Sequence, residues 1–236
     1  SLESLSRIRT SLNKQIMIGV FDIDSVVYEA TYNAEDLDEA IDNFWSKYKD
    51  VVYNMEVRYG SVKMINVGFC RHNYRATIFD TYKANRKDSI KPEFLAPLIE
   101  YVKDNLDVVT RSFVETDDIV AKLMLQYGKD KAVIISIDKD YMQFEGTIYN
   151  YRKKEFVEVS KEEAYFNFWS QMIIGDSSDN VKGVKGLGKS WCEKNLQGLS
   201  EYGMIRLVFK AFANKHKAKG REVFIKTYFQ LKLNIL

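Results

Sequence analysis

The stretch Ile16–Ser25 reads IMIGVFDIDS and decides the fold class. Its first six residues form a continuous apolar run, which is long enough for a buried strand and short for a helix. Two aspartates, Asp22 and Asp24, follow this run directly. Similar apolar runs occur at Val62–Val67 (VKMINV) and Ala132–Ile137 (AVIISI). The sequence therefore predicts three buried strands.

Helical patterns separate these strands. Across Leu37–Met55, apolar residues recur at three- and four-residue steps, with Asn33 as the expected helix cap. A second helix is predicted over Thr116–Tyr127, and a third, rich in aromatic residues, over Lys161–Ile174. Strands that alternate with helices predict an α/β fold with a mainly parallel central sheet flanked by helices.

Bulk composition excludes several classes of protein. The 236 residues, 46% of them hydrophobic, suffice for a moderately large globular unit. No run approaches the roughly 18 apolar residues of a membrane span, and Ser1–Lys14 lacks the apolar stretch of a secretory signal. Cys70 and Cys192 lie far apart and the chain has two histidines, which argues against a zinc site or disulfides and favours a reducing cytoplasm. Whether residues 1–16 are native stays open, because Met17 begins the first apolar run.

The net charge of +2 conceals an uneven distribution. Residues 180–236 carry 12 Lys and Arg against three acidic residues, which leaves 23 basic and 30 acidic side chains for residues 1–179. This asymmetry favours a surface for a polyanion beside a site that concentrates negative charge. A solvated basic tail explains the charge alone equally well. We expect an α/β catalytic region over 1–179 and a basic helical region over 180–236, within one compact unit.

Acidic residues gather where the predicted strands end and the predicted helices begin. In a parallel α/β sheet, such positions meet in the crevice at the carboxyl edge, where ligands bind. Each group alone is more often a turn or a helix cap than a ligand site, but the four together reverse that expectation. The groups are Asp22 with Asp24, Glu115 with Asp117 and Asp118, Asp138 with Asp140, and Asp176 with Asp179.

Carboxylates in such number need cations. Without them, repulsion would raise the pKa values of the carboxylates or separate the loops that carry them. Ligand sets made only of oxygen favour Mg²⁺ or Mn²⁺ over zinc. Two such ions about 3.5–4 Å apart stabilise both the attacking and the leaving oxygen of a phosphoryl displacement. The acidic groups therefore predict a two-metal site suited to phosphoryl displacement.

The segment Gly183–Ser190, GVKGLGKS, places closely spaced glycines before a helical pattern. Glycines let backbone N–H groups approach a phosphate, and the start of a helix adds partial positive charge. Lys185 and Lys189 add cationic reach, although the spacing is not that of a nucleotide P-loop. A glycine-rich connector with incidental lysines is the alternative, but the preceding acids favour contact with a nucleic-acid backbone.

Five short motifs, in this order, resemble the 5′ nucleases of bacteriophages, bacterial DNA polymerases and flap endonucleases. The resemblance extends from about Ile16 to Leu196, and the phage members are the most similar. The motifs are Phe21-Asp-Ile-Asp-Ser25, Tyr82-Lys-Ala-Asn-Arg86, Glu115-Thr-Asp-Asp118, Ile135-Ser-Ile-Asp-Lys-Asp140 and Gly175-Asp-Ser-Ser-Asp-Asn180.

The resemblance implies roles for the acidic groups. They would hold two Mg²⁺ ions, for which Mn²⁺ can substitute, and Asp138 with Asp140 would be shared between the two metal sites. Asp118 and Asp24 are adjacent candidates for action through water. The implied metal ligands are Asp22, Glu115, Asp117, Asp118, Asp138, Asp140, Asp176 and Asp179.

The resemblance also implies how DNA is held. Residues from about 71 to 100 would form a helical arch through or beneath which the 5′ strand passes, with Lys83 and Arg86 stabilising charge on the scissile phosphate. Gly183–Leu196 would form a helix–three-turn–helix element that grips the duplex, with a potassium ion as a further candidate ligand. The expected DNA contacts are Arg75, Tyr82, Gly183, Lys185, Gly186, Gly188, Lys189 and Ser190.

One departure from the family pattern leaves alternatives open. Many relatives carry a further aspartate after the second strand, where this chain has Gly68. Asp24 or water would compensate in an active enzyme, which would cut DNA at a 5′ end or 5′ flap. The main rival is a catalytically impaired DNA-binding relative; a single-strand ribonuclease is a second, but it gives Gly183–Ser190 no role. The sequence leaves open exonuclease against flap preference, RNA–DNA hybrid substrates and replication partners, and a monomer is expected.

Overall fold

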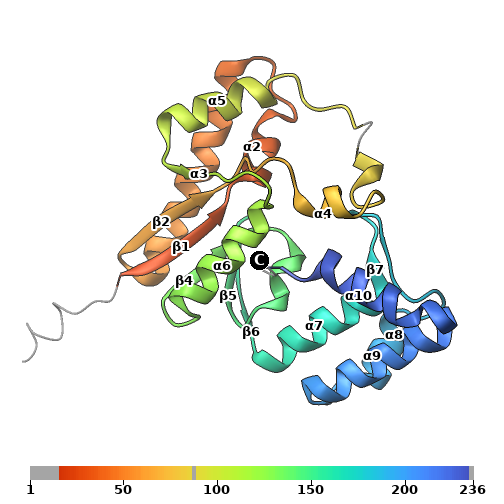
Figure 1. Ribbon diagram of the computed structural model, residues 1–236. Helices are drawn as coiled ribbons and strands as arrows, with labels where there is room; N and C mark the ends of the chain where they lie inside the picture. The colour runs from red at the N-terminus through yellow and green to blue at the C-terminus, as the bar shows by residue number, and fades with distance from the viewer. Residues whose placement is uncertain (1–15, 87–88, 234–236) are drawn as a thin grey trace, which may run out of the picture.

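The structure is a computed structural model that describes residues 16–86 and 89–233 (Figure 1). The opening segment, where no secretory signal is predicted, lies outside the described residues. A six-stranded sheet has the order β3-β2-β1-β4-β5-β6, and every pair is parallel except β5 with β6. Its strands are β1 (Met17–Asp22), β2 (Val62–Val67), β3 (Val108–Val109), β4 (Ala132–Ile135), β5 (Gly146–Asn150) and β6 (Glu155–Val159).

Strand β1 lies in the middle of the sheet, and its register sets the position of the candidate site. Asp22 pairs with Val67 of β2, and Phe21 pairs with Ile135 of β4, so the carboxyl ends of the three strands are nearly level. Successive side chains of β1 enter different cores, Val20 on one face and Phe21 on the other. Burial on both faces explains why β1 is continuously apolar rather than alternating.

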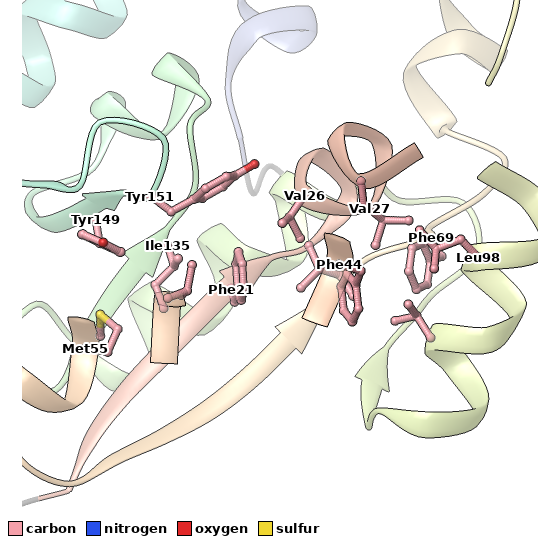
Figure 2. Close-up of a cluster of buried hydrophobic side chains, with 14 of the residues drawn as sticks. Phe21, Val26, Val27, Phe44, Met55, Phe69, Leu98, Ile135, Tyr149 and Tyr151 are labelled. Carbon is pink, nitrogen blue, oxygen red and sulfur yellow. The ribbon is translucent and has the colours of Figure 1, made fainter. Parts of the chain in front are cut away.

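Three helices cover the face of the sheet on which Phe21 lies: α2 (Asp24–Thr31), α3 (Leu37–Tyr59) and α5 (Leu95–Asn105). Figure 2 shows the core between them and the sheet, with Phe21, Phe44 and Leu98 among its buried side chains. Asp36 caps α3 by accepting a hydrogen bond from the Glu39 N–H, so the expected cap at Asn33 is wrong.

Helix α6 (Thr116–Tyr127) covers the other face, where Val20, Val120 and Ile134 share a core. Its bounds are those predicted from the sequence. Helix α7 (Lys161–Ile174) also has the predicted bounds, and Ser160 opens it with a capping box. In such a box the serine side chain and the glutamate at the third position satisfy backbone N–H groups reciprocally.

The C-terminal helices form a third core with α7. Helices α8 (Lys189–Asn195), α9 (Glu201–His216) and α10 (Gly220–Leu231) contribute buried residues that meet Phe168 and Met172. Two short strands, β7 (Gly175–Asp176) and β8 (Val181–Lys182), pair in an antiparallel turn between α7 and α8. Among the helices in the described part of the chain, none combines the length and apolarity needed to cross a bilayer.

The predicted excursion between β2 and α5 contains two short helical turns. These are α4 (Tyr74–Ile78) and a 3₁₀ turn, η1 (Ala84–Arg86). In Figure 1, α4 lies between the upper helices and α10. Residues 87–88 of this predicted arch lie outside the described residues. The architecture is the expected mixed α/β fold with a mostly parallel sheet.

Candidate active site

Two polar side chains tie distant acidic groups together at the carboxyl edge of the sheet. The Tyr82 hydroxyl lies 2.9 Å from both Glu115 Oε2 and Asp179 Oδ2. The Gln171 amide donates to Asp140 Oδ1 at 2.8 Å and lies 3.3 Å from Asp176 Oδ2. Asp22 interacts electrostatically with Asp138, which connects the remaining group. All four acidic groups of the sequence therefore lie in one neighbourhood.

The start of α6 carries the tightest acidic group. Glu115 occupies the N-cap position, and Asp117 and Asp118 lie in the first turn. One carboxylate oxygen from each of the three lies within 4.8 Å of the others. This donor set consists only of carboxylate oxygens, so it fits a hard divalent cation such as Mg²⁺. Negative charge here also interacts favourably with the helix dipole.

Arg75 lies beneath this group and is fully buried. Its guanidinium bonds Glu115 Oε2 at 2.7 Å and both oxygens of Asp118, at 2.6 and 2.8 Å. It also donates to the backbone oxygens of Phe229 (3.2 Å) and Lys232 (2.7 Å) at the end of α10. The expected DNA contact at Arg75 is therefore wrong: its charge is consumed by acids in the interior, and the side chain has no access to a ligand.

The same correction applies to Tyr82, which retains 4% of its surface. Its hydroxyl points to Glu115 and Asp179, and burial raises the pKa of Tyr82 above its usual value, with Glu115 adding to the shift. A neutral Tyr82 therefore positions carboxylates instead of meeting DNA.

The motif Tyr82–Arg86 is joined to the β7–β8 turn. The Lys83 N–H donates to the Asp179 backbone oxygen at 2.9 Å, and Arg86 Nη2 lies 2.7 Å from Asp179 Oδ1. Lys83 Nζ forms an ion pair with Glu115 and lies 3.7 Å from Asp179 Oδ1. Although burial opposes it, Glu115 raises the pKa of Lys83, which keeps the ammonium charged. The Tyr82–Arg86 motif thus places two cations against Asp179, which lies about 90 residues later in the sequence. Lys83 also neutralises Glu115.

Asp24 occupies the space beside Gly68. Asp24 Oδ1 accepts the Phe69 N–H at 2.7 Å, and Oδ2 accepts the Thr116 hydroxyl at 2.6 Å. A Cβ added to Gly68 would lie 3.0 Å from Asp24 Oδ1 and 2.8 Å from a side-chain carbon of Ile23. A larger residue at position 68 would therefore compete with the present placement of Asp24.

The raised pKa values of several acids indicate that the site lacks positive charge. Burial raises the pKa of Asp22 to about 7, and Asp24 adds to the shift. Burial and the neighbouring Asp138 raise the pKa of Asp140 to about 7. Burial also raises the pKa of Asp117 well above its usual value, and Glu115 contributes. Carboxylates with raised pKa values gain from a bound cation, because it stabilises their ionised form.

Asp176 differs from the other acids. Burial alone would raise its pKa, but hydrogen bonds from Ser178 and the Lys139 ammonium at 3.0 Å lower it to about 2. Asp179 follows the opposite trend, since burial raises its pKa despite Lys83 and Arg86. The site therefore holds one acid, Asp176, whose pKa is about 2, beside two, Asp22 and Asp140, whose pKa values are about 7.

Comparisons with known proteins identify the family of the chain. Residues 25–168 match the family described as 5′-3′ exonuclease, N-terminal resolvase-like domain. The match covers more than half of the 236 residues. The chain belongs to this family.

Two relatives indicate the range of this 5′-3′ exonuclease family. DNA polymerase I of Caldicellulosiruptor bescii is 28% identical over 171 residues, which are 63% of this chain and 19% of that protein. Flap endonuclease Xni of Colwellia psychrerythraea is 27% identical over 157 residues, 58% of this chain and 51% of its own length. The chain thus spans about half or less of these relatives.

A solved structure of the bacteriophage T5 flap endonuclease, in a pseudo-enzyme–product complex with DNA and metal ions, has a similar fold. Its TM-score is 0.58 at 15% identity, and the alignment covers 91% of this chain and 98% of the T5 chain. At this identity the similarity establishes the fold alone.

The glycine element lies at the surface in this family member. Lys185, Gly186, Gly188, Lys189 and Ser190 are exposed. Gly183 is half-buried, and a Cβ there would lie 2.1 Å from the Ile173 backbone oxygen. The close approach of the turn to α7 therefore explains why residue 183 is a glycine, without any contact to a phosphate.

Gln171, Lys139 and Tyr141 also contact the acids and were not predicted from the sequence. Tyr141 donates to Asp22 Oδ2 at 2.8 Å, while Gln171 and Lys139 hold Asp176. Lys139 and Tyr141 flank Asp140, so proximity to a predicted ligand was an available signal. Gln171 lies on α7 outside every motif, and only the path of that helix brings it to the acids.

Proposed function

We propose that the chain is a divalent-metal-dependent 5′ nuclease that hydrolyses phosphodiester bonds of DNA with a 5′ end or a 5′ flap. The observation that carries the proposal is the single neighbourhood in which all four acidic groups meet, with Lys83 and Arg86 at its border. Family membership and the likeness to a flap endonuclease with DNA and metal ions support it.

The acids would hold the two metal ions. We assign them Asp22, Glu115, Asp117, Asp138, Asp140, Asp176 and Asp179. Asp24, beside Gly68, and Asp118, whose two oxygens bond Arg75, would contribute indirectly. When bound, Mg²⁺ or Mn²⁺ supplies positive charge to the attacking and leaving oxygens of a phosphodiester.

The cationic side chains of the chain would act on the phosphate. Lys83 and Arg86 neutralise Glu115 and Asp179 now, and each is partly exposed, with 23% and 52% of its side-chain surface accessible. A scissile phosphate could exchange for these acids, because charge-assisted bonds to phosphate oxygens are strong. Lys83 and Arg86 would thereby stabilise the charge that develops during displacement.

The basic region 180–236 would hold the duplex. Of the predicted arch over about 71–100, the part before α5 would pass over the single strand, because α5 packs on the sheet from Leu95 onward. Gly183–Leu196 would act as the helix–three-turn–helix grip, with exposed Lys185 and Lys189 at phosphates and a potassium ion as a candidate ligand. Action as a monomer in the cytoplasm, on RNA–DNA hybrids as well as DNA, and beside replication proteins extends the same proposal.

Cleavage of a 5′-labelled flap duplex tests the function. Wild-type chain should cut near the flap junction with Mg²⁺, whereas EDTA or Asp138→Asn should abolish cutting. Asp130→Asn, a change of an exposed aspartate outside the acidic groups, should leave activity intact. Tight binding without cutting in Mg²⁺ and in Mn²⁺ would refute the enzyme and favour a DNA-binding relative.

A further inference from the structure

Phe113 is a large apolar side chain in an unusual place. It lies between β3 and α6, two residues before Glu115, and 66% of its surface is exposed. Its backbone is left-handed, with φ of 67°. A bulky residue adopts this region rarely and at a cost, whereas glycine adopts it freely. Neither burial nor backbone preference explains a phenylalanine here.

The backbone around Phe113 is firmly held. The Phe113 N–H donates to the Arg71 oxygen at 2.8 Å, and the Tyr74 N–H donates to the Phe113 oxygen at 3.3 Å. A parallel bridge joins Arg71 to Ser112. These bonds continue the pairing of β2 with β3 beyond the strands. The exposed Phe113 ring is therefore attached to a backbone segment that is held by hydrogen bonds on both sides.

His72 completes an aromatic surface. Its backbone is also left-handed, with φ of 59°, and its ring lies 6.0 Å from that of Phe113 at 36°. Two arginines, Arg71 and Arg111, are exposed beside the pair. Strained backbone positions cluster where proteins contact ligands, and an aromatic face flanked by cations suits a base with its phosphates.

A cavity of about 1050 Å³ borders both this surface and the candidate active site. Its lining includes His72 and Arg71, which lie next to Phe113, and Asp24 and Arg86 of the candidate active site. Sites of several hundred Å³ accommodate drug-sized ligands, so this space admits a short length of single strand. A strand whose phosphate meets Arg86 would pass His72 on its way out.

We propose that Phe113, together with His72, stacks on an unpaired base of the single strand next to the cleavage site. The proposal rests on the nuclease function proposed above and adds a base-contacting position to it. Stacking is independent of base identity, because every base has a π-face. The contact would fix the strand in register without sequence preference.

The substitution Phe113→Gly separates this role from a structural one. Glycine suits the left-handed backbone, so the melting temperature should stay at or above the wild-type value. Affinity for a 5′-flap duplex, measured by fluorescence anisotropy in EDTA, should fall by on the order of 10-fold, as expected for one lost stacking contact. Tyr53→Ala, a change of an aromatic residue on α3 with nearly the same exposure (65%), should leave the affinity unchanged.

Abasic nucleotides placed singly along the flap identify the contacted base. At one flap position, removing the base should weaken binding to the wild-type chain by about 10-fold but should not change binding to Phe113→Gly. The stacking contact would be overturned if the affinity losses from the abasic nucleotide and from Phe113→Gly added at every flap position. It would also be overturned if Phe113→Gly and the wild-type chain bound the flap equally well. Either result would leave the proposed nuclease function intact. A wild-type chain that neither binds nor cuts flaps would overturn both.

Discussion

Replacing Arg75 by methionine tests whether the buried guanidinium supports the acidic groups. Methionine fills a similar volume without charge or hydrogen bonds. The change would leave Glu115 and Asp118 without their buried cation, and the Phe229 and Lys232 oxygens without their donor. The loss therefore reaches both α6 and the end of α10.

The expected magnitude follows from the burial. Arg75 has 0% and Glu115 and Asp118 each have 9% of their side-chain surface exposed. Removing one partner of a buried ion pair costs about 3–5 kcal/mol, because the other charge stays desolvated. For a chain of this size 1 kcal/mol corresponds to about 2–4 °C. We expect Arg75→Met to lower the melting temperature by about 6–20 °C.

Calorimetry or circular dichroism melts in EDTA measure this effect without bound metal. Arg58→Met is the matched control, since the Arg58–Glu158 pair at 3.0 Å is exposed and such pairs contribute about 0–1 kcal/mol. Equal melting temperatures for Arg75→Met and Arg58→Met would refute the assignment of Arg75 as an internal support.

Three further predictions concern titration, positioning and packing. Burial raises the pKa of Asp22 from 3.8 to about 7. The protonated carboxyl group therefore stabilises the fold below pH 4, and this contribution is lost as the pH rises through 7. The melting temperature without metal should fall from pH 5 to 8, and a flat profile would contradict this. Gln171→Leu should weaken Mn²⁺ binding, measured by calorimetric titration, by about 10-fold or more, whereas exposed Gln126→Leu should not; equal affinities would remove the positioning role. Gly183→Ala should lower the melting temperature because its Cβ would meet backbone at 2.1 Å, while Gly188→Ala, with nothing within 4 Å, should not; similar melts would show that the turn relaxes.

The sequence predicted the parts of this fold that depend on local pattern. The bounds of β2, α6 and α7 follow from apolar periodicity and caps, and the mostly parallel sheet follows from their alternation. Helix α5 and the β5–β6 hairpin were not predicted. Their apolar faces are short, and they are buried against elements that are distant in sequence.

The candidate site was predictable to the extent that chemistry follows strand ends. Acids after β1 and β4 had to approach one another once the sheet was parallel. The burial of Arg75 and Tyr82 was not predictable, because a basic or aromatic residue in a polar segment is typical of a nucleic-acid contact. Only the path of the chain beneath α6 shows that both side chains face inward.

The charges of the assembled site show that its internal cations do not balance its acids. Among the described residues, nine carboxylates gather here, with Asp24 included, and four cations contact them: Arg75, Lys83, Arg86 and Lys139. If all nine were ionised, the difference would be five negative charges, and this excess is consistent with the raised pKa values of Asp22 and Asp140. Two divalent ions would reduce it to about one. Arg75 is buried and holds its acids in place. The partly exposed Lys83 and Arg86 would be free to bind the phosphate if divalent ions took over the neutralisation of Glu115 and Asp179.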